Sequence, residues 1–259
     1  MRIATYNVWN NGVVVNRFEQ LIYEITTIHA DIIAMQEVTT QFYQDALKDL
    51  TEYQYSEFKP YSGEDEGLAI FSKYPFESCT FLHLKEEYCY SNALNVLFKV
   101  GNARYSLTNV HLPWDSIKAK EEQAIAIDKF IHTQKEMADY FILVGDFNCS
   151  SNSSVHRFLV GDQTLYGNES NPYWLDVAGN YTAITGTSFL PTLDCINNPR
   201  WKGKNTIYAP ENCDRLYIMD NWNNFAFKNV QLFGTKVNPV NNLCASDHYG
   251  VLADIEFSI

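Results

Sequence analysis

The sequence of 259 residues predicts a single α/β domain with mixed sheets, spanning residues 1–259. Near its start, the chain reads as a strand, a helix and a second strand, an order that usually makes the two strands parallel. Further along, the pattern changes to short strands separated by turn residues, which is typical of antiparallel pairing. No repeat of fixed period and no Gly/Ser-rich linker divides the chain, so one domain is the simplest organisation.

The first elements follow from apolar periodicity. Residues 2–6 alternate as a strand does, and residues 31–36 form a short apolar run that predicts the next strand. Between them, apolar residues at helical spacing predict a helix that begins at Asn16, where Asn16 and Glu19 resemble a capping box. A second helix is predicted over residues 40–50.

The later elements are mostly short strands. Gly101 and Asn102 form a good hairpin turn between two of them. Helices are predicted over residues 116–133 and near 155–159, whereas residues 186–212 have no clear structure, which is typical of functional or mobile loops. The predicted strands cover residues 53–58, 67–72, 79–84, 93–100, 104–110, 140–144, 215–219, 226–233 and 249–257.

The composition limits the partners and the compartment. The net charge is -12, and long nucleic acid is held mainly through phosphate neutralisation by basic residues. Nucleic acid is therefore expected to bind only locally, through a metal and a small basic spot. No apolar run of about 18 residues predicts a transmembrane helix. The start lacks the features of a signal peptide, so we expect a cytoplasmic protein with reduced thiols, and most simply a monomer.

Six predicted apolar strands carry a polar group at one end. Each group alone has an ordinary structural explanation, such as a turn former before a strand. Together, the carboxylates and amides are the donors that Mg²⁺, Mn²⁺ or Ca²⁺ prefers, and two histidines add acid–base groups. No Cys cluster or HExxH motif indicates zinc. The groups are Asn7, Glu37, His111, Asp146 with Asn148, Asp214, and Asp247 with His248.

Five short motifs carry a resemblance to a known family. They are TYN (5–7), MQEV (35–38), NVHL (109–112), GDFN (145–148) and SDHYG (246–250). In this order they resemble the motifs of the endonuclease/exonuclease/phosphatase superfamily, whose DNase I-like members cleave phosphate esters. The resemblance implies a four-layer α-β-β-α sandwich of two mixed sheets flanked by helices, with the strand ends meeting at one cleft.

The resemblance also implies a metal site and a base. Glu37 would bind Mg²⁺, with Mn²⁺ as a substitute, and Asn7 would lie beside it. Asp247 would support a second ion or a water molecule. Asp146 would face the scissile phosphate and orient or deprotonate the attacking water.

The remaining motif residues would contact the phosphate. Asn148 would donate a hydrogen bond to it, and His248 would stabilise the transition-state oxygens or act as general acid or base. Asp214 would orient His248 through the other ring nitrogen. His111 matches a position that also contacts the phosphate, so the two histidines share the assignment of the leaving-group proton.

The substrate is indicated by one branch of the family. The segments PTLDCINNPRW (191–201) and NCDRLYIM (212–219) resemble the substrate-side loop and following strand of the 5′-tyrosyl-DNA phosphodiesterases, with Asp194 and Asn197 at matching positions. The stretch NVHLPWD departs from that branch. Trp114 and Trp201 are candidates to stack on a base or an aromatic leaving group, or else they cap the edge of the core.

We therefore predict a divalent-metal-dependent phosphodiesterase acting on a phosphate ester, such as a nucleotide or 5′-tyrosyl-DNA ester. The alternatives are a sphingomyelinase-like lipid phosphodiesterase and a sugar or inositol phosphatase. A non-catalytic binding module of the same fold is disfavoured, because such modules usually lose a metal carboxylate or the histidine of the SDH motif, and this chain keeps them all.

Overall fold

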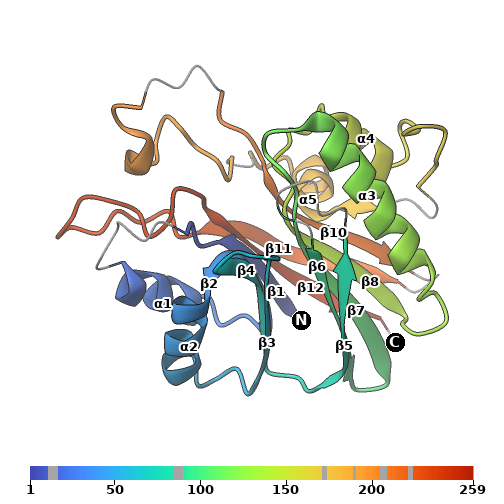
Figure 1. Cartoon of the computed structure of the whole chain (residues 1–259), viewed down its shortest axis with the longest axis horizontal. Helices are drawn as coiled ribbons and strands as arrows, with labels where there is room; N and C mark the ends of the chain where they lie inside the picture. The colour runs from blue at the N-terminus through green and yellow to red at the C-terminus, as the bar shows by residue number, and fades with distance from the viewer. Residues whose placement is uncertain are drawn as a thin grey trace.

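The computed structural model describes residues 1–10, 17–84, 90, 92–170, 174–188, 191–204, 209–220 and 224–258. Two six-stranded sheets lie face to face, and helices cover their outer faces (Figure 1). The predicted α/β fold with an α-β-β-α sandwich is therefore confirmed.

Sheet A is built from both ends of the chain. Its strand order is β11-β12-β1-β2-β4-β3, with β1 and β2 parallel and the other neighbours antiparallel. Two helices, α1 (Phe18–Thr27) and α2 (Thr40–Asp49), pack their apolar faces on its outer side. The strands are β1 (Arg2–Asn7), β2 (Ile32–Thr39), β3 (Tyr55–Pro60), β4 (Glu66–Ser72), β11 (Phe225–Phe233) and β12 (Gly250–Phe257).

Sheet B comes from the middle of the chain. Its order is β5-β6-β7-β8-β10-β9, with β7 and β8 parallel. Helices α3 (Ile117–His132) and α4 (Ser154–Leu159) cover its outer side. The strands are β5 (Phe76–His83), β6 (Asn92–Val100), β7 (Ala103–His111), β8 (Tyr140–Asp146), β9 (Leu175–Asp176) and β10 (Asp214–Asp220).

The inner faces of the two sheets form the central core. Its buried side chains come from strands of both sheets, among them Ile3, Ile70, Val96, Ile142 and Val251. Helix α5 (Val177–Thr185) contributes Val177 and Ala178 to the same core and contacts β10 and β11. This helix therefore covers one open side of the sandwich instead of an outer face.

Several predicted boundaries need correction. The strands predicted at 53–58 and 79–84 lie at 55–60 and 76–83. Tyr53 precedes the first of these strands and packs edge-on against Phe71. The predicted cap at Asn16 lies outside the described residues. Strand β9 and helix α5 were missed, and the loop 186–212 contains a short 3₁₀ helix, η1 (Pro199–Trp201).

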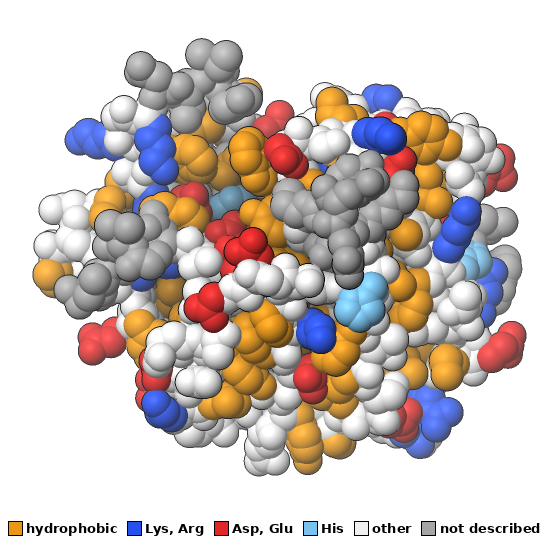
Figure 2. All heavy atoms as spheres, in the orientation of Figure 1, with side chains coloured by type: hydrophobic (Ala, Val, Ile, Leu, Met, Phe, Trp, Pro, Cys, Tyr) orange, Lys and Arg blue, Asp and Glu red, His pale blue; other side chains and the backbone are white. Residues whose placement is uncertain are grey.

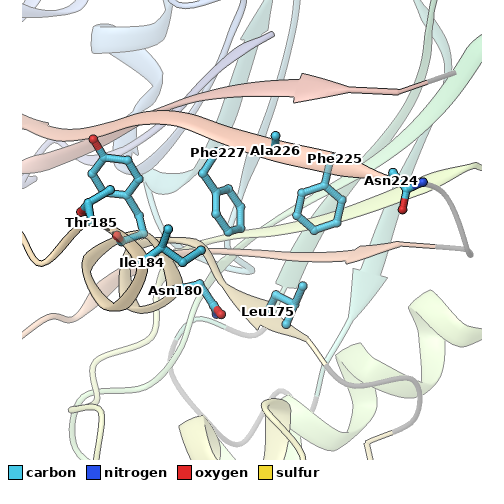
Figure 3. A pocket seen from close by; sticks show the side chains of 9 residues that line it. Leu175, Asn180, Ile184, Thr185, Asn224, Phe225, Ala226 and Phe227 are labelled. Atoms are coloured by element: carbon cyan, nitrogen blue, oxygen red, sulfur yellow. Dashed lines mark hydrogen bonds between the residues drawn. The ribbon is translucent and has the colours of Figure 1, made fainter.

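Two further findings concern a surface pocket and the length of the helices. A pocket of 490 Å³ lies between α5 and β11, with Leu175, Ile184, Phe225 and Phe227 in its lining (Figure 3). None of the polar strand-end residues lines it. No helix among the described residues is long and apolar enough to cross a membrane.

Candidate active site

The sheet topology brings the polar strand ends together. The parallel pairs β1–β2 and β7–β8 place Asn7 beside the segment of Glu37 in sheet A, and His111 beside Asp146 in sheet B. Strand β10 runs antiparallel to β8, so its first residue, Asp214, is the register partner of Asp146. Strand β12 runs antiparallel to β1, which places the residues before it at the same edge.

A bulge in β2 aims Glu37 into the site. The register of β2 against β4 shifts between Met35 and Val38, and Glu37 has a left-handed backbone with φ of 57°. Bulges of this kind re-aim side chains beside active sites. From the opposite sheet, the buried amide of Asn109 donates to the carbonyl oxygens of Met35 (2.9 Å) and Ala69 (3.0 Å). The irregular backbone is therefore stabilised by a hydrogen-bond donor from sheet B.

Asn7 links the carboxylates of the two sheets. Its Nδ2 donates to Glu37 Oε1 at 2.8 Å and to Asp146 Oδ2 at 3.0 Å. Its Oδ1 accepts from the backbone N–H of Trp9, and the other oxygen of Glu37 accepts from the backbone N–H of Asn10, both at 2.9 Å. Asn7 thus fixes the relative position of the predicted metal ligand and the predicted base.

A tight turn presents Asp146 and Asn148. The backbone N–H of Asn148 donates to Asp146 Oδ1 at 2.8 Å, and the Asn148 amide nitrogen lies 3.0 Å from His111 Nε2 and 2.9 Å from the Leu112 oxygen. Because an amide nitrogen only donates, Nε2 of His111 accepts in this arrangement. His111 and Asn148 therefore hold each other in place beside Asp146.

His248 forms a buried charge network with two aspartates. Its Nδ1 lies 2.8 Å from Asp214 Oδ2 and 3.8 Å from Asp146 Oδ2. Burial alone would lower the pKa of His248, but these two carboxylates raise it well above its ordinary value, so the ring is cationic at neutral pH. Burial likewise opposes ionisation of Asp146, yet the electrostatic effects of His248 and His111 and the hydrogen bonds from Asn7 and Asn148 lower its pKa.

The carboxylates on the sheet A side fit a hard divalent cation. Burial, together with the negative charge of Glu37, raises the pKa of Asp247 to about 6 and the pKa of Glu66 to about 7. Mutually repelling oxygen donors of this kind are the ligands that Mg²⁺ prefers. Ligand atoms of Asp146, Asp214 and His248 also lie within 4.8 Å of one another. There, however, Nδ1 of His248 already forms a hydrogen bond with Asp214.

Aromatic and basic side chains surround this acidic centre. The ring of Tyr90 stacks on His111 with centroids 3.7 Å apart and an interplanar angle of 15°. On the other side, the Trp9 ring is approached by Arg17, Arg200 and Lys204 at 5.2 to 5.4 Å. In Figure 2, acidic side chains and a histidine lie in a hollow of the surface with hydrophobic side chains beside them.

The predicted substrate residues lie in different settings. Trp201 contacts the site, because its Nε1 donates to the Asp247 carbonyl oxygen at 3.0 Å. Asp194 is buried, and its oxygens accept from the Ile196 and Asn197 backbones and from the Asn197 amide, so it shapes its own loop. Trp114 is 68 % exposed. Substrate contact by these four residues stays a prediction.

A comparison with known families agrees with this geometry. The profile described as Endonuclease/Exonuclease/phosphatase family matches residues 4–248, which covers every strand-end residue described above. The chain belongs to the endonuclease/exonuclease/phosphatase family. Members of this family are hydrolases that act on phosphate esters and typically use a divalent metal.

Individual relatives within the endonuclease/exonuclease/phosphatase family are distant. A probable CCR4-Not complex 3′-5′-exoribonuclease subunit, Ccr4, of Vairimorpha ceranae is 27 % identical over 181 residues, which are 55 % of this chain and 38 % of that protein. Danio rerio TDP2 complexed with a single-strand DNA product has a TM-score of 0.79 at 16 % identity, covering 99 % of this chain and 98 % of that one. The mannosyl-6-phosphatase of Bacteroides thetaiotaomicron has a TM-score of 0.77 at 18 % identity, covering 99 % and 100 %. These structures share the fold.

Sequence reasoning missed several residues of this site. Asn109 lies inside a quoted motif, yet its bonds across the sheets follow only from the bulge in β2. Asn10 donates through its backbone to Glu37 and through its side chain to Glu66 at 2.8 Å. Glu66 belongs to an acidic run that looks like a solvated turn. Tyr90 has no sequence signal at all, because its role depends on stacking with a residue 21 positions away.

Proposed function

We propose that this chain is a divalent-metal-dependent phosphodiesterase whose reaction centre is Asp146. One observation carries the proposal. Asp146 lies at the centre of a buried network in which Asn7, Asn148 and His248 all contact its carboxylate, from three separate parts of the chain. Removing charged groups from water costs free energy that a fold can avoid by using apolar residues. A catalytic role therefore explains this convergence better than stability does.

The cation would be held on the sheet A side. Glu37 would bind it, with Asn7 and Asp247 beside it, and oxygen donors of this kind favour Mg²⁺ or Mn²⁺. When bound, such an ion neutralises charge on the phosphoryl oxygens and orients the ester. Glu66 and the backbone N–H of Asn10 would set the orientation of Glu37 and its environment.

Proton transfer would use the sheet B side. Asp146, ionised at neutral pH, would orient the attacking water and accept its proton as the new P–O bond forms. Asp214 and Asp146 raise the pKa of His248 well above its ordinary value, so this ring is cationic at neutral pH. We therefore assign to His248 the stabilisation of the phosphoryl oxygens and the proton that the leaving oxygen takes up as its bond to phosphorus breaks. Asp214 would hold the His248 ring through Nδ1.

We propose a nucleotide ester as the substrate, with 5′-tyrosyl DNA as one form of it, because aromatic rings of Trp9, Trp201 and Tyr90 surround the acidic centre. A net charge of -12 disfavours a long duplex, so a strand end or a small ester is expected. The names of the relatives suggest which compounds to compare: an RNA 3′ end, a 5′-tyrosyl oligonucleotide and a mannose phosphate.

The first experiment is hydrolysis of thymidine 5′-monophosphate p-nitrophenyl ester with Mg²⁺, with Mn²⁺ and with EDTA. Asp146→Ala and His248→Ala are measured in parallel, and each should lose about 10²–10⁴-fold in turnover, as for a positioned acid or base. Release that is independent of metal, or near-normal rates in either variant, would contradict the proposal. The three compounds above are then compared to rank the substrate classes.

A further inference from the structure

Five consecutive backbone carbonyls precede β12, and each accepts a hydrogen bond from a side chain. These are the carbonyls of Leu243 to Asp247, the segment that leads into His248. The donors, in the same order, are Gln20 Nε2 at 3.2 Å, Arg200 Nε at 2.8 Å, Arg17 Nη1 at 3.0 Å, Asn198 Nδ2 at 3.0 Å and Trp201 Nε1 at 3.0 Å.

This arrangement replaces the hydrogen bonds of a regular element. Within the described residues, the carbonyls of 244–247 accept no backbone hydrogen bond, and the segment is neither helix nor strand. Buried carbonyls without partners are costly, so the conformation of this segment depends on side chains from elsewhere. Two sources supply them: the region around α1, and residues 198–201 at η1.

The donors at η1 are themselves buried and held in place by hydrogen bonds. Asn198 and Arg200 are only 1 % and 7 % exposed. Asn198 also accepts from the Arg200 backbone at 3.1 Å, so one amide both starts η1 and donates to the Ser246 oxygen. The turn before it is closed by Asp194, whose backbone oxygen accepts from the Asn198 N–H at 3.0 Å.

The same unit is joined to the metal side of the site. Ser246 Oγ donates to the Asn7 backbone oxygen at 2.8 Å. The guanidinium groups of Arg17 and Arg200 lie 5.3 and 5.2 Å from the Trp9 ring. The backbone N–H of Trp9 donates to Asn7 Oδ1. A shift of η1 would therefore reach both Asp247 and Asn7.

We propose that Asn198, Arg200 and Trp201 are positioning residues that fix the backbone under Asp247 and His248. The inference rests on the proposed function and adds to it residues that need not touch the reacting atoms. Misplacement of a catalytic group by about 1 Å can cost about 10²-fold in rate, so loss of one donor should lower kcat with little effect on KM. In this view the segment 191–201 affects catalysis by fixing the backbone of residues 244–247, whichever substrate it also contacts.

The test removes one donor at a time. Trp201→Phe deletes the indole N–H that bonds the Asp247 oxygen and keeps an aromatic ring next to Lys204. The matched control is Trp174→Phe, which deletes an indole N–H bonded to Asp128 at 2.9 Å beside α3. We expect kcat of Trp201→Phe to fall about 10-fold with KM unchanged, as for outer residues that orient a site, and the control to keep wild-type kcat.

A second variant and a second readout keep the test decisive. Asn198→Asp keeps the oxygen that caps η1 and loses the donor to Ser246. Hydrogen exchange of the peptide 243–250, followed by mass spectrometry without substrate, should be faster in both variants and unchanged in Trp174→Phe. Wild-type kcat and exchange in both variants would overturn the proposal, as would an equal loss in the control. If wild-type protein hydrolyses none of the compounds, the proposed function fails, and exchange alone still decides the positioning role.

Discussion

The substitution Gly145→Ala tests how the GDFN motif places Asp146. Gly145 has φ of 139°, and a Cβ atom there would lie 1.9 Å from the Val110 carbonyl oxygen on the paired strand β7. A carbon and an oxygen in close contact need about 3.3 Å, so β8 would have to move by roughly 1.4 Å, which is 3.3 minus 1.9. Because Asp146 is the next residue, we expect kcat to fall by at least about 10²-fold.

The matched control separates the collision from the backbone conformation. Gly186 ends α5 with φ of 71°, and a Cβ atom added there would meet no other atom within 4 Å, so Gly186→Ala should cost only about 1–2 kcal/mol for the left-handed backbone. Urea denaturation measures the free energy of unfolding of both variants, and hydrolysis of the p-nitrophenyl ester measures kcat. Gly145→Ala should be the less stable of the two and nearly inactive. The reasoning is refuted if the two variants match in stability and rate.

Three further predictions concern charge and stacking. Asp214 and Asp146 raise the pKa of His248, so activity that needs the cation is lost as pH rises through that pKa; Asp214→Asn should move this alkaline loss to lower pH, and an unmoved profile would contradict the assignment. Burial raises the pKa of Asp128 despite hydrogen bonds from Trp174 and Ser170, so the folded state binds its proton more tightly and stability falls as pH rises between the unfolded and folded pKa values. Asp128→Asn keeps an acceptor for both donors and should raise Tm at pH 7, with the gain vanishing at acid pH; a pH-independent change would argue otherwise. Tyr90→Leu should lower kcat about 2–12-fold, the equivalent of a stacking energy of about 0.5–1.5 kcal/mol. Tyr90→Phe keeps a ring that can stack on His111 and should keep the wild-type kcat.

Most of the strands could be predicted because they are apolar and separated by turn residues, whereas the sandwich of two sheets was implied by the family resemblance. Helix α5 was missed because its sequence, VAGNYTAIT, contains Gly, Asn and several β-branched residues, which are weak helix formers. Its boundaries are set instead by Asp176, whose side chain accepts from the Gly179 N–H, and by Gly186 at its end. Such local caps are visible in the sequence, but a two-residue strand such as β9 is not.

The candidate site shows a similar division. The residue types at the strand ends, together with the family resemblance of their motifs, predicted a set of side chains that the structure brings together. Their connections could not be predicted, because Asn109 reaches its carbonyl partners only through the register of two facing sheets. For the same reason, nothing in the sequence indicates that the Trp201 indole bonds a backbone oxygen 46 residues away.

The division of the chain between the two sheets has a consequence for synthesis on the ribosome. Sheet B takes all its strands from residues 76–220, whereas sheet A joins β1 to β12, and the amino group of Met1 contacts the Ile255 oxygen at a separation of 254 residues. Domains fold from the amino terminus as they emerge, and pairings this distant close last. Asn7 and Glu37 would therefore wait for Asp247 and His248, which follow only after all the strands of sheet B have been made. The proposed catalytic centre is therefore completed only when the segment before β12 joins the two sheets.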